Sequence, residues 1–188
     1  MTEPDTVTTW YLEQTSPEDL VPAREPDQTV EVSLAQVPSP EFSRFLYTAV
    51  GQDIAWNDRL PWTYAQWRDF LDRPGVETWV AYERGTPAGF IELDGATEGV
   101  TEVSYFGLLP AFRGHGIGGH LLSCGLKRAW DLADRWPDRP RTQRVWVHTC
   151  TKDGEHARAN YEKRGFRLYR TETEQEQGVP QPGPWPGA

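Results

Sequence analysis

A glycine-rich turn spans residues 114–119, with the sequence GHGIGG, between an extended apolar run and a stretch with helical spacing. Glycines let main-chain N–H groups approach an anion closely, and the start of the following helix adds its own unpaired N–H groups and its positive dipole end. The turn is therefore suited to a cofactor that carries a diphosphate. The structural alternative is a flexible turn that only precedes a helix.

The spacing of this turn narrows the choice of cofactor. No Lys-Ser or Lys-Thr pair closes the glycine stretch, as a P-loop for ATP requires, and the next strand carries His148 where dinucleotide-binding proteins have an acidic residue. A dinucleotide-dependent oxidoreductase is thus disfavoured. The remaining pattern is R-x-x-G-x-G, formed by Arg113, Gly116 and Gly118 at a strand-to-helix junction.

A second motif follows at residues 160–166, with the sequence NYEKRGF. Gly165 is expected to end a helix as its C′ residue, and Phe166 is expected to begin the next strand. With both motifs in the order strand, glycine turn, long helix, strand, short helix and Gly-Phe strand, the chain resembles the GNAT superfamily of acyl-CoA-dependent N-acyltransferases. The resemblance is strong over residues 76–172.

The resemblance implies acetyl-CoA as cofactor, with its pyrophosphate on residues 114–119. The main chain of residues 106–108 should pair with the acyl carbonyl and the pantetheine arm, which behaves like an added strand. The cofactor-binding residues expected on this basis are Phe106, Gly107, Leu108, Arg113, Gly114, His115, Gly116, Ile117, Gly118, Gly119 and Asn160. The chain departs from the family where Asp153 and Gly154 replace an asparagine that often precedes the short helix.

Acyl transfer to an amine needs a neutral nucleophile, a polarised carbonyl and a proton for the departing thiolate. The resemblance makes Tyr161 the general acid, with a packing role as the alternative. Glu102 lies eleven residues before Arg113, where some members of the family carry a general-base carboxylate. Its apolar neighbours favour a raised pKa. The alternative for Glu102 is a solvent-facing carboxylate. His148 is expected near the reaction centre, as a proton relay, an acceptor contact or a structural group.

Aromatic residues crowd into the twelve positions 56–67, beside acidic residues. In GNAT-like folds this segment borders the acceptor pocket. We therefore expect Trp56, Trp62 and Asp58 to bind an amine through cation–π and charge contacts, with core packing as the alternative. Trp67, on a helix, is expected in the core.

Hydrophobic periodicity and turn residues predict the elements that must position these groups. Along residues 101–108, alternation places Glu102, Ser104 and Phe106 on one face and Val103, Tyr105 and Gly107 on the other, and Gly107 is a place for the strand to weaken or bulge. The expected strands are 7–12, 29–32, 78–82, 88–93, 101–108, 144–150 and 166–170, the last prolonged toward 176, and the expected helices are 41–50, 63–71 and 116–133.

The implied fold is of the α/β (α+β) class. It is the GNAT fold, a mixed and mostly antiparallel sheet of six to seven strands with helices on both faces and a splayed central parallel pair. We expect one GNAT N-acyltransferase domain over residues 1–178, with a proline-rich connector at 13–40 and an irregular tail at 179–188.

Composition restricts the partners. The 188 residues carry a formal net charge of −9, which disfavours nucleic acid and anionic membranes. Cys124, Cys150 and the four histidines lack metal-ligand spacing, so no metal is expected. No signal peptide or membrane-length apolar run is present, which makes the cytoplasm the default compartment.

The leading hypothesis is an acetyltransferase that acts by direct attack of a small-molecule or peptide amine in a ternary complex. The alternative is a GNAT-like regulatory module that binds coenzyme A without turnover. The identity of the amine is not readable from the sequence, and a homodimer is left open.

Overall fold

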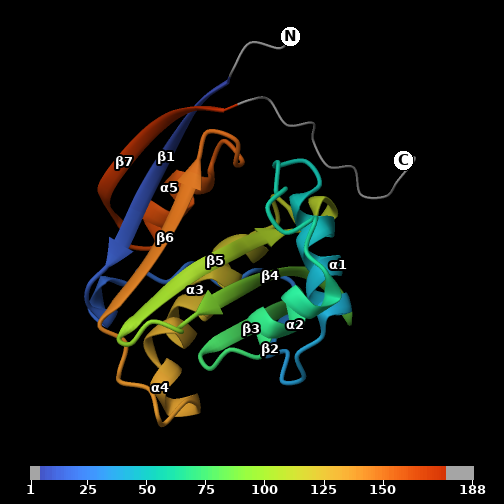
Figure 1. The fold of residues 1–188 in the computed structure, drawn as a ribbon, viewed down its shortest axis with the longest axis vertical. Helices are drawn as coiled ribbons and strands as arrows, with labels where there is room; N and C mark the ends of the chain where they lie inside the picture. The colour runs from blue at the N-terminus through green and yellow to red at the C-terminus, as the bar shows by residue number, and fades with distance from the viewer. Residues whose placement is uncertain (1–4, 177–188) are drawn as a thin grey trace.

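The computed structural model describes residues 5–176, which contain a seven-stranded sheet in the order β2-β3-β4-β5-β6-β1-β7 (Figure 1). Every neighbouring pair is antiparallel except β5 and β6. The strands are β1 (Asp5–Gln14), β2 (Val30–Leu34), β3 (Val76–Glu83), β4 (Thr86–Asp94), β5 (Val100–Leu108), β6 (Arg144–Cys150) and β7 (Arg167–Glu176). The helices are α1 (Pro40–Gly51), α2 (Tyr64–Leu71), α3 (Ile117–Trp130), α4 (Leu132–Arg135) and α5 (Ala157–Lys163), with 3-10 turns at Pro17–Asp19 and Pro110–Phe112.

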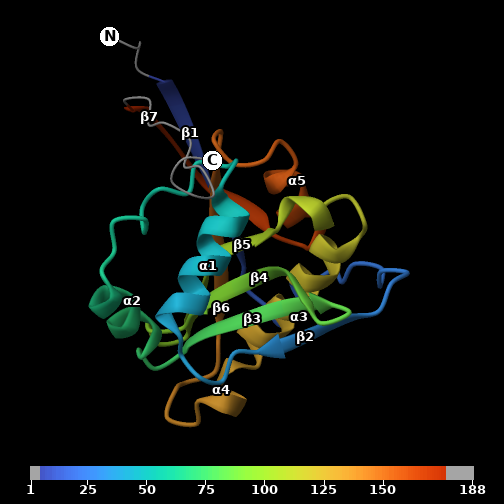
Figure 2. The same cartoon turned by 90° about the vertical axis from the view of Figure 1, so that its right-hand side faces the viewer.

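Helices cover both faces of the sheet (Figure 2). The larger core lies under α3 and α5, where residues such as Leu121, Val147 and Phe166 are buried together. On the opposite face, Leu46 and Val50 of α1 pack with Phe90 of β4. The expected class, with a mixed sheet and helices on both faces, is confirmed.

The parallel pair at the centre of the sheet is splayed. The pairing of β5 with β6 runs only from Val100 to Glu102, opposite residues 144–146, and the strands then diverge (Figure 1). Beyond Glu102, β5 therefore turns a strand edge toward an opening. Such an edge is a template for an extended ligand.

The predicted grouping of Glu102 with Phe106, and of Val103 with Tyr105, is wrong, because β5 contains a bulge. Its pairing with β4 steps from Leu93–Val103 to Glu92–Tyr105, so Ser104 is an extra residue. Glu102 and Tyr105 consequently share the α1 face, whereas Phe106 packs with the core under α3. The predicted bulge thus lies at Ser104, three positions before Gly107.

Local signals place most other element ends close to expectation. Ser39 and Thr63 cap α1 and α2 with their side chains, and Gly165 has a left-handed φ of +92° after α5. The helix predicted at 116–133 is two helices, because the chain leaves helical geometry at Asp131. The predicted tail at 179–188 lies outside the described residues. Among residues 5–176, no helix is long and apolar enough to cross a membrane.

Candidate functional site

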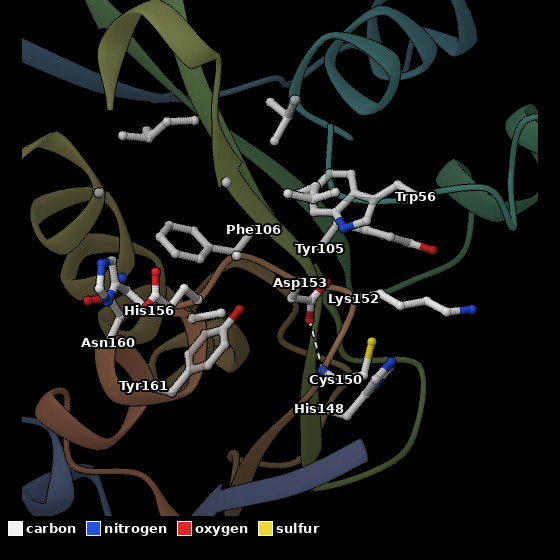
Figure 3. Close-up of a pocket in the computed structure, with 18 of the residues that line it drawn as sticks. Trp56, Tyr105, Phe106, His148, Cys150, Lys152, Asp153, His156, Asn160 and Tyr161 are labelled. Atoms are coloured by element: carbon white, nitrogen blue, oxygen red, sulfur yellow. Dashed lines mark hydrogen bonds between the residues drawn. The ribbon is translucent and has the colours of Figure 1, made fainter. Parts of the chain in front are cut away.

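A cavity of about 880 Å³ opens where β5 and β6 diverge (Figure 3). Its walls come from β5, the glycine turn, the loop after α1, the end of β6, and the segment that runs through α5. Figure 3 shows Phe106 and Tyr161 on one side of the cavity and Trp56 and Tyr105 on another. The splay of the sheet therefore brings members of the predicted cofactor, catalytic and acceptor sets to one cavity.

The glycine turn forms part of the cavity wall through Gly114, Gly116, Gly118 and Gly119. Gly114 and Gly116 have φ values of +82° and +81°, and a Cβ on Gly114 would have nothing within 4 Å. Gly116 caps α3 without a side-chain acceptor, and the first turn of α3 holds no acidic residue. Its first N–H groups are therefore available to an external anion.

Two residues of the turn lie away from the cavity wall. The His115 carbonyl accepts a hydrogen bond from Gln28 Nε2 at 2.9 Å, and its ring is exposed. Ile117 is fully buried in the core under α3. Their expected contact with the cofactor stays a prediction and can involve only the main chain of Ile117.

The Arg113 side chain binds protein atoms instead of pointing freely into the glycine turn. Its Nε donates to the Leu108 carbonyl at 3.1 Å, and its Nη2 donates to the Val50 carbonyl at 3.2 Å and to Asp53 at 2.9 Å. The hydrogen bond from Arg113 lowers the pKa of Asp53. Arg113 thus joins the end of β5 to the end of α1, which leaves its main chain for the predicted cofactor contact.

Residues 106–108 line the cavity along the free edge of β5. Gly107 is required here by close packing, because a Cβ would lie 2.5 Å from Val50 Cγ1 and 3.6 Å from Trp56 Cη2. The α1 end and Trp56 therefore lie directly on the backbone of this edge. Packing explains this glycine, rather than the weakened strand proposed from sequence.

Tyr161 lies on α5 and is buried, with its ring 6.1 Å from that of Phe106 and 5.8 Å from that of Phe166. Its phenol lines the cavity, and Figure 3 shows it directed inward. Burial raises the pKa of Tyr161 far above its usual range, and the nearby Asp153 carboxylate adds to this effect. The phenol therefore keeps its proton at any working pH.

Glu102 and His148 meet across the splayed pair, with Nδ1 of His148 3.8 Å from Oε1 of Glu102. The His148 side chain is 47% exposed and lines the cavity. The Glu102 side chain is 26% exposed and is not part of the cavity wall. Burial, with the neighbouring Asp94 and Glu92 carboxylates, raises the pKa of Glu102 to about 7. Glu102 can therefore accept a proton near neutral pH.

The predicted acceptor residues separate into two groups. Trp56 and Asp58 line the cavity, and the Trp56 ring lies 4.8 Å from that of Tyr105. Trp62 lies away from the cavity wall and packs 5.2 Å from Trp67, which is 2% exposed and belongs to the core as expected.

Sequence reasoning missed a buried ion pair that holds the loop after α1. Arg59 Nη2 lies 2.8 Å from Glu92 Oε1, and both side chains are less than a tenth exposed. The guanidinium also lies 4.2 Å from the Phe70 ring centre and 4.5 Å from that of Tyr105. Such cation–π contacts offset part of the cost of burying the charge. The only sequence signal was a charged residue, Glu92, within an otherwise apolar strand.

Asp153 is a second functional candidate that the sequence marked only as a departure. Its Oδ2 accepts hydrogen bonds from Thr149 Oγ1 at 2.5 Å and from Cys150 N at 3.0 Å (Figure 3). Asp153 therefore fixes the turn at the end of β6, near the Tyr161 phenol. Within residues 5–176, no group of three or more His, Cys, Asp or Glu side chains is arranged to hold a metal ion.

Comparison with known proteins identifies both a family and a fold. The profile of the acetyltransferase (GNAT) family matches residues 39–166. The chain has no significant match among curated proteins.

Solved structures with the same fold include a GCN5-related N-acetyltransferase from Kribbella flavida, with a TM-score of 0.62, 18% identity, and coverage of 95% of this chain and 60% of that one. A GCN5-related N-acetyltransferase from Sphaerobacter thermophilus has a TM-score of 0.58, 18% identity, and coverage of 94% and 54%. A tandem GNAT protein from the clavulanic acid biosynthesis pathway has a TM-score of 0.54, 16% identity, and coverage of 96% and 56%. The chain therefore spans less than two thirds of the length of these relatives.

Proposed function

Because the chain belongs to the GNAT acetyltransferase family, we propose that it transfers the acetyl group of acetyl-CoA to a primary amine. The observation that carries the proposal is the single cavity that joins the glycine turn, the free edge of β5, Tyr161 and His148. Binding, protonation and deprotonation groups for one acyl transfer therefore face one space. The amine attacks directly in a ternary complex.

The residues present fit an acyl-CoA cofactor. The open space at Gly114 and the uncapped N–H groups of α3 suit its diphosphate, and the edge of residues 106–108 suits an extended arm. The bound cofactor supplies an activated thioester. The Leu108 N–H is proposed to polarise the carbonyl, and Asn160, which lines the cavity, is proposed to contact the cofactor.

Tyr161 is proposed as the general acid. A phenol with a strongly raised pKa retains its proton and can donate it to a thiolate, which forms transiently in a site of low polarity. The neighbouring Phe106 and Phe166 rings pack against the Tyr161 ring and hold it in place.

His148 and Glu102 are proposed to deprotonate the amine as a pair. His148 lines the cavity and takes the proton, while Glu102 lies behind it and stabilises the resulting charge. Transfer to Glu102 through water uses the same geometry. In either route Glu102 acts in its ionised form, which predominates above about pH 7.

Trp56 and Asp58 are proposed to border the acceptor. The indole lies over Gly107, at the free edge, and the exposed Asp58 carboxylate lies 3.5 Å from the Tyr105 hydroxyl. An ammonium group would be attracted to such a wall before it loses its proton. Trp62 is proposed to act indirectly by packing the loop that carries these residues. The free thiols of Cys124 and Cys150 fit the proposed cytoplasmic compartment.

Two measurements test the function. Calorimetry should detect binding of acetyl-CoA, and release of free thiol should accelerate when amines, arylamines, amino acids or peptide N-termini are added. Absence of binding by both acetyl-CoA and coenzyme A would reject the proposal. Tight binding without thiol release on any acceptor would instead favour a regulatory module that holds coenzyme A.

A further inference from the structure

A second arginine beside the glycine turn lacks a partner for one buried nitrogen. Nη1 of Arg164 is buried and makes no hydrogen bond to the described residues. It lies 3.7 Å from the position that a Cβ on Gly119 would occupy, in the first turn of α3. A buried guanidinium N–H without an acceptor is costly unless a ligand supplies one.

Arg164 is one of the residues that line a second cavity, of about 260 Å³. It shares Phe106, Gly119, Asn160 and Lys163 with the larger cavity and is further lined by Arg24. No carboxylate belongs to its wall, as far as the described residues show. Arg24, Lys163 and Arg164 therefore form a cationic corner of this cavity, next to the glycine turn.

The charges of this corner have the same sign. The N-terminus of the fourteen-residue α3 has neither an acidic residue in its first turn nor a side-chain cap, and Arg164 adds a full positive charge beside it. Lys163 is exposed next to Arg164, whereas Arg24 pairs with Asp27 at 3.0 Å. An external anion would stabilise this local cluster of positive groups.

The Arg164 backbone is fixed by contacts that its side chain does not share. Its N–H donates to the Tyr161 carbonyl at 2.9 Å, and its carbonyl accepts from Gln14 Nε2 at 2.8 Å and from Val21 N at 3.1 Å. The guanidinium is therefore held at the cavity without contributing those bonds. Arg113 contrasts with it, because its guanidinium is satisfied by protein acceptors.

We propose that the Arg164 guanidinium binds a phosphate group of the cofactor and is the charged side chain of the phosphate site. The inference rests on the proposed function, since it assumes coenzyme A in the larger cavity. Its chemistry is a charge-assisted hydrogen bond to a phosphate oxygen beside the α3 N–H groups. The phosphate belongs either to the diphosphate or to the 3′-phosphate of the ribose.

Calorimetric titration of the full chain with coenzyme A and with 3′-dephospho-coenzyme A tests the inference and separates the two phosphates. Arg164→Gln should raise the Kd of coenzyme A about 10- to 100-fold, the range for loss of one charged hydrogen bond. An equal loss with both ligands assigns the diphosphate. A loss confined to coenzyme A assigns the 3′-phosphate.

Two further variants keep the result interpretable. Arg164→Lys retains the positive charge but lacks the paired N–H donors of a guanidinium. Its Kd for coenzyme A should lie between those of wild type and Arg164→Gln. Arg68→Gln, an exposed arginine on α2, removes one charge elsewhere and should leave the Kd within twofold of wild type.

Thermal unfolding without ligand separates binding from a structural role. Arg164→Gln should keep or raise the Tm, because the side chain it removes is an unpaired cation beside a positive helix end. A lowered Tm with unchanged affinity overturns the inference and assigns Arg164 to the fold. Equal affinity of Arg164→Gln and wild type also overturns it, with the proposed function intact, whereas a wild-type chain that binds neither ligand overturns both.

Discussion

Nδ1 of His148 lies 3.8 Å from Oε1 of Glu102, across the point where β5 and β6 cease to pair. The bulge at Ser104 places Glu102 on the α1 face of the sheet, where Asp94 and Glu92 also lie. The Glu102 carboxylate, whose pKa is raised, therefore lies next to the His148 imidazole, which lines the cavity.

The rate of thiol release should depend on pH through Glu102. Burial and neighbouring carboxylates raise its pKa to about 7, so its ionised form is depleted below neutrality. We expect kcat to fall about tenfold per pH unit below pH 7 and to level off above it. Glu102→Gln should lose about a hundredfold at pH 8 and lose this pH dependence. An unchanged pH profile in the variant would exclude Glu102 from the mechanism.

Glu102 and His148 should behave as one unit. We expect His148→Gln to lower kcat about 10- to 100-fold and the double variant with Glu102→Gln to be little worse than the slower single variant, because each change disables the same proton transfer. Steady-state kinetics of the four proteins at pH 8 measures the coupling. Fully additive losses would show that the two side chains act independently.

Tyr161→Phe should lower kcat about a hundredfold while the Kd of coenzyme A changes less than threefold. The phenyl ring keeps its packing against Phe106 and Phe166, and only the acidic proton is lost. Thiol-release kinetics and calorimetry on the same preparation provide the two values. Equal turnover would return Tyr161 to a purely structural role.

Glu102 should also affect stability in a pH-dependent way. Its pKa is raised from 4.5 to about 7, so folding favours the protonated form, and this contribution is fully present below pH 4.5 and lost as the pH rises through 7. Glu102→Gln should therefore stabilise the chain at pH 8 by about 1 kcal/mol, a value discounted for the exposed part of the side chain. Urea unfolding should show no such gain at pH 4.5, and a gain that is equal at both pH values contradicts the assignment.

Gly107→Ala should destabilise the chain by about 1–3 kcal/mol, because its Cβ would lie 2.5 Å from Val50 Cγ1. Gly154→Ala is the matched control, since its Cβ has nothing within 4 Å and its φ is not left-handed. Urea unfolding of both variants measures the difference. Equal stability of the two variants would show that the end of α1 moves away from β5 at little cost.

Local sequence patterns were sufficient for the elements and for the motifs that they carry. The apolar periodicity of α3, the Thr63 cap of α2 and the left-handed Gly165 after α5 depend on neighbouring residues, so these elements were placed near their observed ends. The glycine turn and the motif that contains Tyr161 could likewise be located in the sequence, and the roles of their residues follow from the family resemblance.

The sequence by itself determined the order of elements, the family and the position of the glycine turn, because these depend on residues close together in the chain. Only the tertiary structure decided which side chains face the cavity. The bulge at Ser104 reverses the alternation of β5, and it is defined by pairing with β4. The partners of Arg113 lie up to 63 residues away, and those partners turn its guanidinium from the glycine turn, whereas the Arg164 guanidinium lies beside the turn at Gly119. The direction of a long side chain depends on the hydrogen-bond acceptors that folding brings near it. Those acceptors cannot be read from local residue spacing.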